Sequence, residues 1–158
     1  MTACVDFTVH YRATTFRVKA PNGHIDIRVG EKHPGIDALL SRHNATEWAY
    51  ITAWNPGSQP LSGDQNELAH LTLLQAIRDR GFECYVGDGI PDNEGWTPER
   101  SVWVAGIGRA EAVALGVRFG QNAIVAGTIG GVAELVNCRE DGRDAQHTIR
   151  GGGVRSRE

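Results

Sequence analysis

The chain has 158 residues, of which 41% are hydrophobic and 22% charged, and its formal net charge is −3. These values are typical of one globular domain with enough chain to bury a core. The small negative charge gives no electrostatic reason to expect non-specific binding to nucleic acid or to an anionic membrane. The three cysteines are widely spaced, which argues against a disulfide framework and against a cysteine-rich zinc site. We therefore expect the protein to be located in the reducing cytoplasm.

The first residues lack the basic and apolar segments of a signal peptide, and no apolar run reaches the roughly 18 residues of a membrane span. We therefore expect a single globular domain over residues 1–137, located in the cytoplasm and without a membrane partner. The last residues are poor in apolar side chains and include a Gly-Gly-Gly run. We expect them to form a disordered tail over 138–158.

The first third of the chain predicts a hairpin followed by a short helix. Residues 1–12 fit either a short strand or a frayed terminal segment. Alternating apolar and polar residues predict a half-buried strand over 24–29. A Pro-Asn-Gly turn joins this strand to another over 13–19, and Pro34 suits the first turn of a helix that runs to about residue 43.

The middle of the chain has the most regular pattern. Residues 48–54 are rich in aromatic and β-branched side chains and predict a strand. Ser62 and Gln65 have the spacing of a capping box at the start of the next helix, and Gly81 suits its end. The stripe of this helix that we expect to be buried consists of Leu68, Leu71, Leu74 and Ile77.

Shorter elements complete the domain. We expect strands over 82–86, 101–105, 122–126 and 132–136, a helix over 108–119, and a long turn over 87–100. From residue 48 to residue 126 the order is β-α-β-β-α-β, which predicts an α+β fold with a ferredoxin-like core. The N-terminal β-hairpin and short helix precede this core, and one C-terminal strand follows it.

Chain direction predicts which loops are neighbours. The strand over 48–54 ends at one edge of the sheet, which we call the exit edge, and the next helix begins there. Later reversals of the chain bring the turn over 87–100 and the end of the helix over 108–119 to the same edge. Because loops carry function more often than the scaffold beneath them, we expect the ligand-binding residues there: Asn55, Ser58, Gln59, Trp96, Glu99, Arg100, Arg118 and Gln121.

Four motifs stand in these segments: Thr52-Ala-Trp-Asn-Pro56 with Pro60-Leu-Ser62, Trp96-x-Pro-Glu-x-Ser101, Arg109-x-Glu-Ala112 and Phe119-Gly-Gln-Asn-Ala-Ile124. In these motifs and in their order the chain resembles a bacterial family known as domain of unknown function 3293. The likeness covers roughly residues 10–136, and one departure is Gly108, where a serine-like helix cap is more usual. The resemblance implies a single cytoplasmic domain and brings no assigned activity.

The polar turn has both a binding and a structural interpretation. Residues 55–61 lead into a capped helix, and a helix N-terminus attracts anions. Asn55 and Ser58 are also the residue types that bond to the backbone of a turn. Gln121 has the same ambiguity, because its amide fits either a ligand or a loop carbonyl.

The charged and aromatic candidates are equally open. Trp96 fits a lid over a ligand, and it fits a cap on the edge of the core. Glu99 and Arg100 fit a carboxylate and a guanidinium of the site, and they fit a surface salt bridge.

Several other functions lack the residues that they need. The six histidines are scattered without metal-ligand spacing, so we expect no metal and no cofactor, and no G-x-S-x-G motif is present. Glu111 replaces the third glycine of a dinucleotide fingerprint that begins at Gly106. The Arg80-Gly81-Phe82 sequence lacks the aromatic residues that complete an RNA-recognition motif, so no specific nucleic-acid partner is expected.

Three functional hypotheses remain. In the first, the exit edge binds a small polar or anionic, nucleotide-like ligand. Arg100 or Arg118 would supply the countercharge, Trp96 a stacking face, and the neutral side chains of the edge hydrogen bonds. In the second, an enzyme acts at the same edge with Glu99 or Asp88 as general base. In the third, a strand edge pairs with another chain in an interaction or inhibitor module, and homo-oligomers are left open.

Overall fold

The computed structural model describes residues 7–93, 95 and 97–138, and seven strands in this part of the chain form one antiparallel sheet. The strand order is β2-β1-β4-β5-β3-β6-β7. The α+β class predicted from the sequence is therefore confirmed. The elements are α1 (Phe7–Arg12), β1 (Thr14–Ala20), β2 (Gly23–Ile27), α2 (Pro34–Arg42), β3 (Glu47–Thr52), a 3-10 turn η1 (Pro56–Ser58), α3 (Gly63–Asp79), β4 (Glu83–Pro91), β5 (Glu99–Ala105), α4 (Arg109–Arg118), β6 (Ala123–Thr128) and β7 (Glu134–Asn137).

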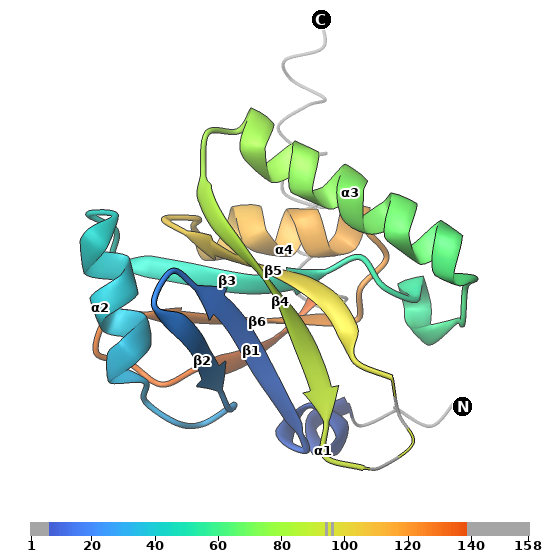
Figure 1. Cartoon of the computed structure of the whole chain (residues 1–158), viewed down its shortest axis with the longest axis horizontal. Coiled ribbons are helices and arrows are strands. Elements are labelled where there is room, and N and C mark those ends of the chain that lie inside the picture. Colours follow the sequence, from blue (N-terminus) through green and yellow to red (C-terminus); the bar gives the residue numbers. More distant parts are fainter. Residues whose placement is uncertain (1–6, 94, 96, 139–158) are drawn as a thin grey trace, which may run out of the picture.

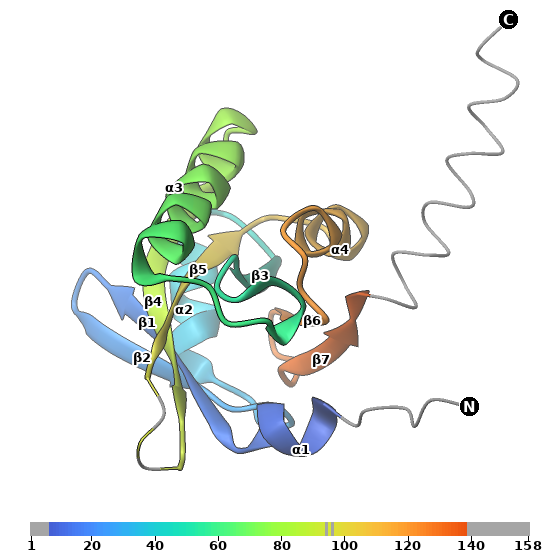
Figure 2. The same ribbon diagram turned by 90° about the vertical axis from the view of Figure 1, so that its right-hand side faces the viewer.

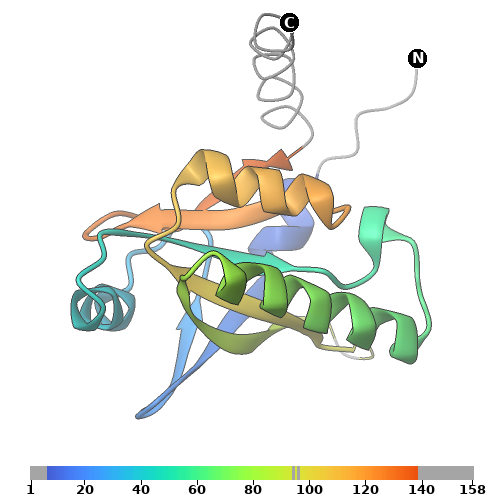
Figure 3. The same ribbon diagram turned by 90° about the horizontal axis from the view of Figure 1, so that it is seen from above.

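Helices cover both faces of the sheet. α3 and α4 lie on one face and α2 on the other (Figure 1, Figure 2). Seen from above, α3 and α4 run side by side in opposite chain directions (Figure 3). Successive strand residues point to opposite faces, so β3 supplies both cores: Ile51 packs with α3 and α4, and Tyr50 packs with α2.

The sheet is curled, and its two outer strands are drawn together by a loop. The segment after β2 forms backbone hydrogen bonds with the segment before β7. Gly30 donates to Ala133, Ala133 donates to Glu31, and Lys32 forms a bridge with Val132. These contacts fold the N-terminal hairpin and α2 around the face opposite to α3 and α4.

The structure corrects the predicted turn over 87–100. β4 runs to Pro91 and β5 begins at Glu99, so the connection is shorter than predicted. Gly87 pairs with Val18 of β1, and a Cβ on Gly87 would lie 1.8 Å from the carbonyl oxygen of Arg17. The glycine permits a close approach between strands and does not mark a turn.

The structure also corrects the buried stripe of α3. Leu68 and Leu71 are 67% and 51% exposed, whereas Leu74 and Ile77 are buried as predicted. Two polar residues, Asn66 and His70, occupy the inward positions instead. The predicted capping box is present: the Gln65 N–H donates to the Ser62 hydroxyl, and the Ser62 N–H donates to the Gln65 side chain.

Candidate functional site at the exit edge

The turn after β3 and the corner after α4 are in direct contact at the exit edge, which lies on the right of Figure 1. The Gly57 N–H donates to the Gly120 carbonyl with an N···O distance of 2.6 Å. Gly120 has a φ of +72°, and a Cβ on it would lie 2.7 Å from the Cβ of Pro56. Two segments about 60 residues apart in sequence are thus held together by backbone, at a position where only glycine fits.

Asn55 has a structural task in this turn. Its φ is +44°, a left-handed conformation that asparagine tolerates better than most residues. Its side-chain oxygen accepts hydrogen bonds from the Leu61 N–H and from the Asn66 amide, and its own N–H donates to the Asn66 side chain. Asn66 is 2% exposed, so this pair fixes the turn against α3.

Gln121 braces the corner in a similar way. It is 8% exposed, and its amide nitrogen donates to the carbonyls of Trp54 and Phe119, both at 3.2 Å. These bonds account for an amide at the start of a strand. Asn55 and Gln121 therefore have a structural role at this edge. A ligand there would contact other side chains, which these two residues hold in place.

The neighbouring residues Glu99 and Arg100 face opposite sides of the sheet, because they are successive residues of β5. Arg100 points toward α3, where its Nη1 forms an ion pair with Glu67. The Thr52 hydroxyl donates to the Arg100 carbonyl at 2.7 Å. The two predicted site residues thus do not line one cavity, and Arg100 is the one that shares a face with α3.

Glu99 lies in a half-buried environment on the other face. Burial raises the pKa of its carboxyl above the usual range. Tyr11 of α1 lies nearby, and its pKa is raised by burial and further by the charge of Glu99. In both groups the main cause is burial, which disfavours the charged form of a carboxyl and of a phenol.

The remaining predicted residues differ in what the structure says of them. Arg118 is exposed, its guanidinium lies 5.2 Å from the centre of the Phe119 ring, and it forms no ion pair with any described residue. Gln59 is also exposed and ends η1. Ser58 lies in η1, but its side chain lies outside the described part of the chain, as does all of Trp96.

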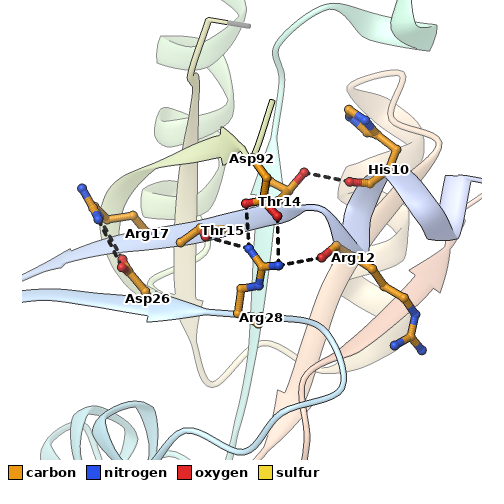
Figure 4. Close-up of polar contacts among 8 residues, drawn as sticks. All are labelled: His10, Arg12, Thr14, Thr15, Arg17, Asp26, Arg28 and Asp92. Carbon is orange, nitrogen blue, oxygen red and sulfur yellow. Dashed lines mark hydrogen bonds and ion pairs between the residues drawn. The ribbon is translucent and has the colours of Figure 1, made fainter. Parts of the chain in front are cut away.

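One arginine anchors the start of the loop that leads to β5 (Figure 4). Arg28 donates two hydrogen bonds to the Asp92 carboxylate, and two more to the Thr15 hydroxyl and the Arg12 carbonyl. The Asp92 N–H also donates to the Ala13 carbonyl. This network ties the end of β4 to α1 and the N-terminal hairpin, so the loop leaves the sheet from a fixed point.

His70, like Asn66, is a buried polar residue of α3 that was not among the predicted site residues. Its ring is 0% exposed, and neither Nδ1 nor Nε2 has a hydrogen-bond partner. Each unsatisfied buried polar atom costs about 1–3 kcal/mol. The signal was its spacing from Asn66, Leu73 and Ile77, which places all four on one side of a helix.

Two hollows lie at the opposite edge of the sheet, where β3 begins. One has a volume of about 110 Å³ and is lined in part by Trp48, Arg109 and Thr128. The other has a volume of about 330 Å³ and is lined in part by His43 and Glu83. Both include Glu47, and neither contains a predicted exit-edge residue.

The described residues also bear on metal binding and on membrane insertion. No three side chains of His, Cys, Asp or Glu within them gather in a geometry that would hold a metal ion. None of their helices has both the length and the apolar character that a membrane crossing requires.

A family of proteins of unknown function, DUF3293, matches residues 51–124. The chain therefore resembles this family over a segment that begins in β3 and ends in β6, and the match is shorter than the 10–136 expected from the motifs. The match starts just before the Asn55 turn and ends just after the Gln121 corner. No curated protein and no solved structure matches the chain.

Proposed function

We propose that this chain binds a small anionic ligand at the exit edge, on the side of the sheet that α3 covers. The observation that carries the proposal is the hydrogen bond between Gly57 and Gly120. It joins two separate segments of the family-matched region into one braced surface. Arg118 precedes Gly120 by two residues, and the Arg100 carbonyl accepts a hydrogen bond from Thr52 at the end of β3. A rigid surface with fixed cations loses little entropy when it binds an anion.

The residues divide into those that hold the surface and those that contact the ligand. Asn55 and Gln121 hold it, because their side chains bond to the protein itself. Arg118 supplies a countercharge, since its stacking on an aromatic ring leaves its N–H groups for an anion. Arg100 supplies a second cation and Gln59 a neutral hydrogen bond.

A calorimetric screen of nucleotides and phosphorylated metabolites tests this function. We expect at least one of them to bind, and Arg118→Ala to weaken the binding by about tenfold, as for loss of one charged hydrogen bond. Arg42→Ala is the matched control, because Arg42 is an exposed arginine at the end of α2, on the opposite edge. The proposal fails if nothing in the screen binds, or if the two variants weaken binding equally.

A second candidate function is catalysis with Glu99 as general base. The supporting observation is the burial that raises the pKa of this carboxyl, because general bases are often tuned in this way. Glu99 faces away from Arg100, so such a reaction would take place on the α1 side of the sheet. Turnover of a substrate that persists in Glu99→Gln would rule this function out.

A third candidate, an interaction module, is supported by the exposed leucines of α3. Leu68 and Leu71 lie one turn apart and are both more than half exposed. Sedimentation of the chain alone and after Leu68→Glu measures whether copies associate through this helix. If both the unmodified chain and Leu68→Glu sediment as monomers, self-association through α3 is ruled out.

We also propose the finer classification of the fold and the location of the protein. The order β4-β5-β3-β6 within the antiparallel sheet supports a ferredoxin-like core. Cys84 and Cys138 are thiols, which supports the cytoplasm. An experimental structure and cell fractionation test these two statements.

A further inference from the structure

The imidazole of His70 is buried between α3 and the sheet without any hydrogen bond. Leucine would fill the inward side of a helix without leaving polar atoms unsatisfied. The presence of a histidine that lowers stability at this buried position therefore needs an explanation other than packing. Functional sites are where natural proteins keep residues that stability disfavours.

The charged groups around His70 belong to three elements. Glu67 precedes His70 by one turn on α3, Arg100 of β5 forms the ion pair with Glu67, and Asp88 of β4 lies opposite Arg100 in the sheet. Burial lowers the pKa of His70, and the Arg100 cation lowers it further, whereas the two carboxylates act in the opposite direction. The ring is therefore neutral near pH 7, with one N–H donor and one acceptor nitrogen.

The ion pair next to this ring lies at the surface. The side chains of Arg100 and Glu67 are 41% and 40% exposed. Arg100 uses only Nη1 for Glu67, and its other N–H groups have no hydrogen-bond partner among the described residues. A solvent-exposed ion pair contributes little to stability, so this pair can move outward at small cost. Because the ring of His70 is 0% exposed, a ligand reaches the imidazole only if such a movement occurs.

We propose that His70 is a ligand-contact residue of the exit-edge site. A phosphate or carboxylate oxygen of the ligand accepts one hydrogen bond from the imidazole N–H and another from a guanidinium N–H of Arg100. Glu67 keeps the guanidinium in position. This inference rests on the proposed function, and it identifies the ligand as an oxyanion held by Arg100 and His70 together. Neutral donors and a cation are the usual partners of such a group.

The test uses inorganic phosphate and adenosine monophosphate as probes of the whole chain. Imidazole nitrogen signals are followed by NMR in the unmodified protein, so this part does not depend on whether a variant folds. We expect the His70 ring signals to move on saturation. The His43 ring is the matched control, since it lies at the opposite edge and bonds to Tyr85, and we expect its signals to remain still.

Calorimetry and denaturation of His70→Leu complete the experiment. We expect this variant to unfold at a higher denaturant concentration and yet to bind adenosine monophosphate about tenfold more weakly. A purely structural histidine would not separate these two readouts in this way. If the backbone amides of the exit edge shift but the His70 ring does not, and His70→Leu binds normally, this inference is wrong and the proposed function stands. If neither probe shifts any exit-edge amide, this inference is wrong, and the proposed function is wrong as well if no compound in the calorimetric screen binds.

Discussion

The N–H of Gly57 lies 2.6 Å from the carbonyl oxygen of Gly120, and this contact joins the turn after β3 to the end of α4. Because both partners are backbone atoms, the contact depends on chain conformation more than on side-chain identity. The same contact leaves no room for a Cβ on Gly120. The exit edge is therefore most sensitive to changes at this glycine.

Gly120→Ala is expected to lower the free energy of unfolding by about 2–4 kcal/mol. The alanine meets both a positive φ and a clash with Pro56. Gly81→Ala is the matched control, since Gly81 has a φ of +83° and no atom within 4 Å of its would-be Cβ. It should lose only about 1 kcal/mol. Chemical denaturation measures both, and equal losses would mean that the contact with Pro56 is unimportant.

Two substitutions of Asn55 separate its backbone role from its side-chain role. Asn55→Gly keeps the left-handed conformation and loses the bonds to Leu61 and Asn66, at a cost of about 1–2 kcal/mol. Asn55→Ala loses the same bonds and also strains the backbone, for about 1 kcal/mol more. Thermal or chemical unfolding compares them. Identical stabilities would show that the φ of +44° is not maintained in solution.

His70 predicts a dependence of stability on pH. Burial lowers its pKa in the folded state, so the unfolded chain takes up a proton that the folded chain does not. Stability should be complete above the unfolded value of about 6.5 and decrease as pH falls from there toward the folded pKa. His33, whose pKa is also lowered by burial, contributes in the same direction. The His70→Leu variant should therefore lose less stability than the unmodified chain between pH 7.5 and 5.5; equal losses would contradict this role.

Glu99 predicts the opposite dependence. Burial raises its pKa in the folded state, so its contribution is favourable below the unfolded value of about 4.3 and is lost as pH rises through the folded pKa. Glu99→Gln should therefore stabilise the chain at pH 7, and the gain should shrink toward pH 4. Glu83→Gln, at an exposed position, is the control and should change stability little. A Glu99→Gln variant that is less stable at pH 7 would contradict the burial argument.

Chain direction was sufficient to predict that two distant segments meet at one edge. A strand, a helix and a reversal leave few choices for where the next loop lies, and the Gly57–Gly120 bond places the turn and the corner together. The pattern of residue types could not show that Asn55 and Gln121 would use their side chains on the protein itself. Hydrogen-bond partners depend on distances that a sequence does not contain.

Two errors in the sequence interpretation have physical causes. The leucines of α3 suggested one buried stripe, but the stripe through Asn66 and His70 also passes through Leu74 and Ile77. Hydrophobicity alone favours the stripe through Leu68 and Leu71. The hydrogen bonds between Asn66 and Asn55 favour the stripe through Asn66 and His70. Gly87 suggested a turn because glycine is common there, but it serves the close approach of β4 to β1.

The most direct measurement of the central claim is a map of backbone amide shifts on addition of adenosine monophosphate. If the exit edge is the binding surface, the shifts should be concentrated at residues 55–61, 99–101 and 118–122. The hollows at the opposite edge offer the clear alternative. Shifts concentrated at residues 43–47, 81–83 and 105–106 would place the ligand there and contradict the account.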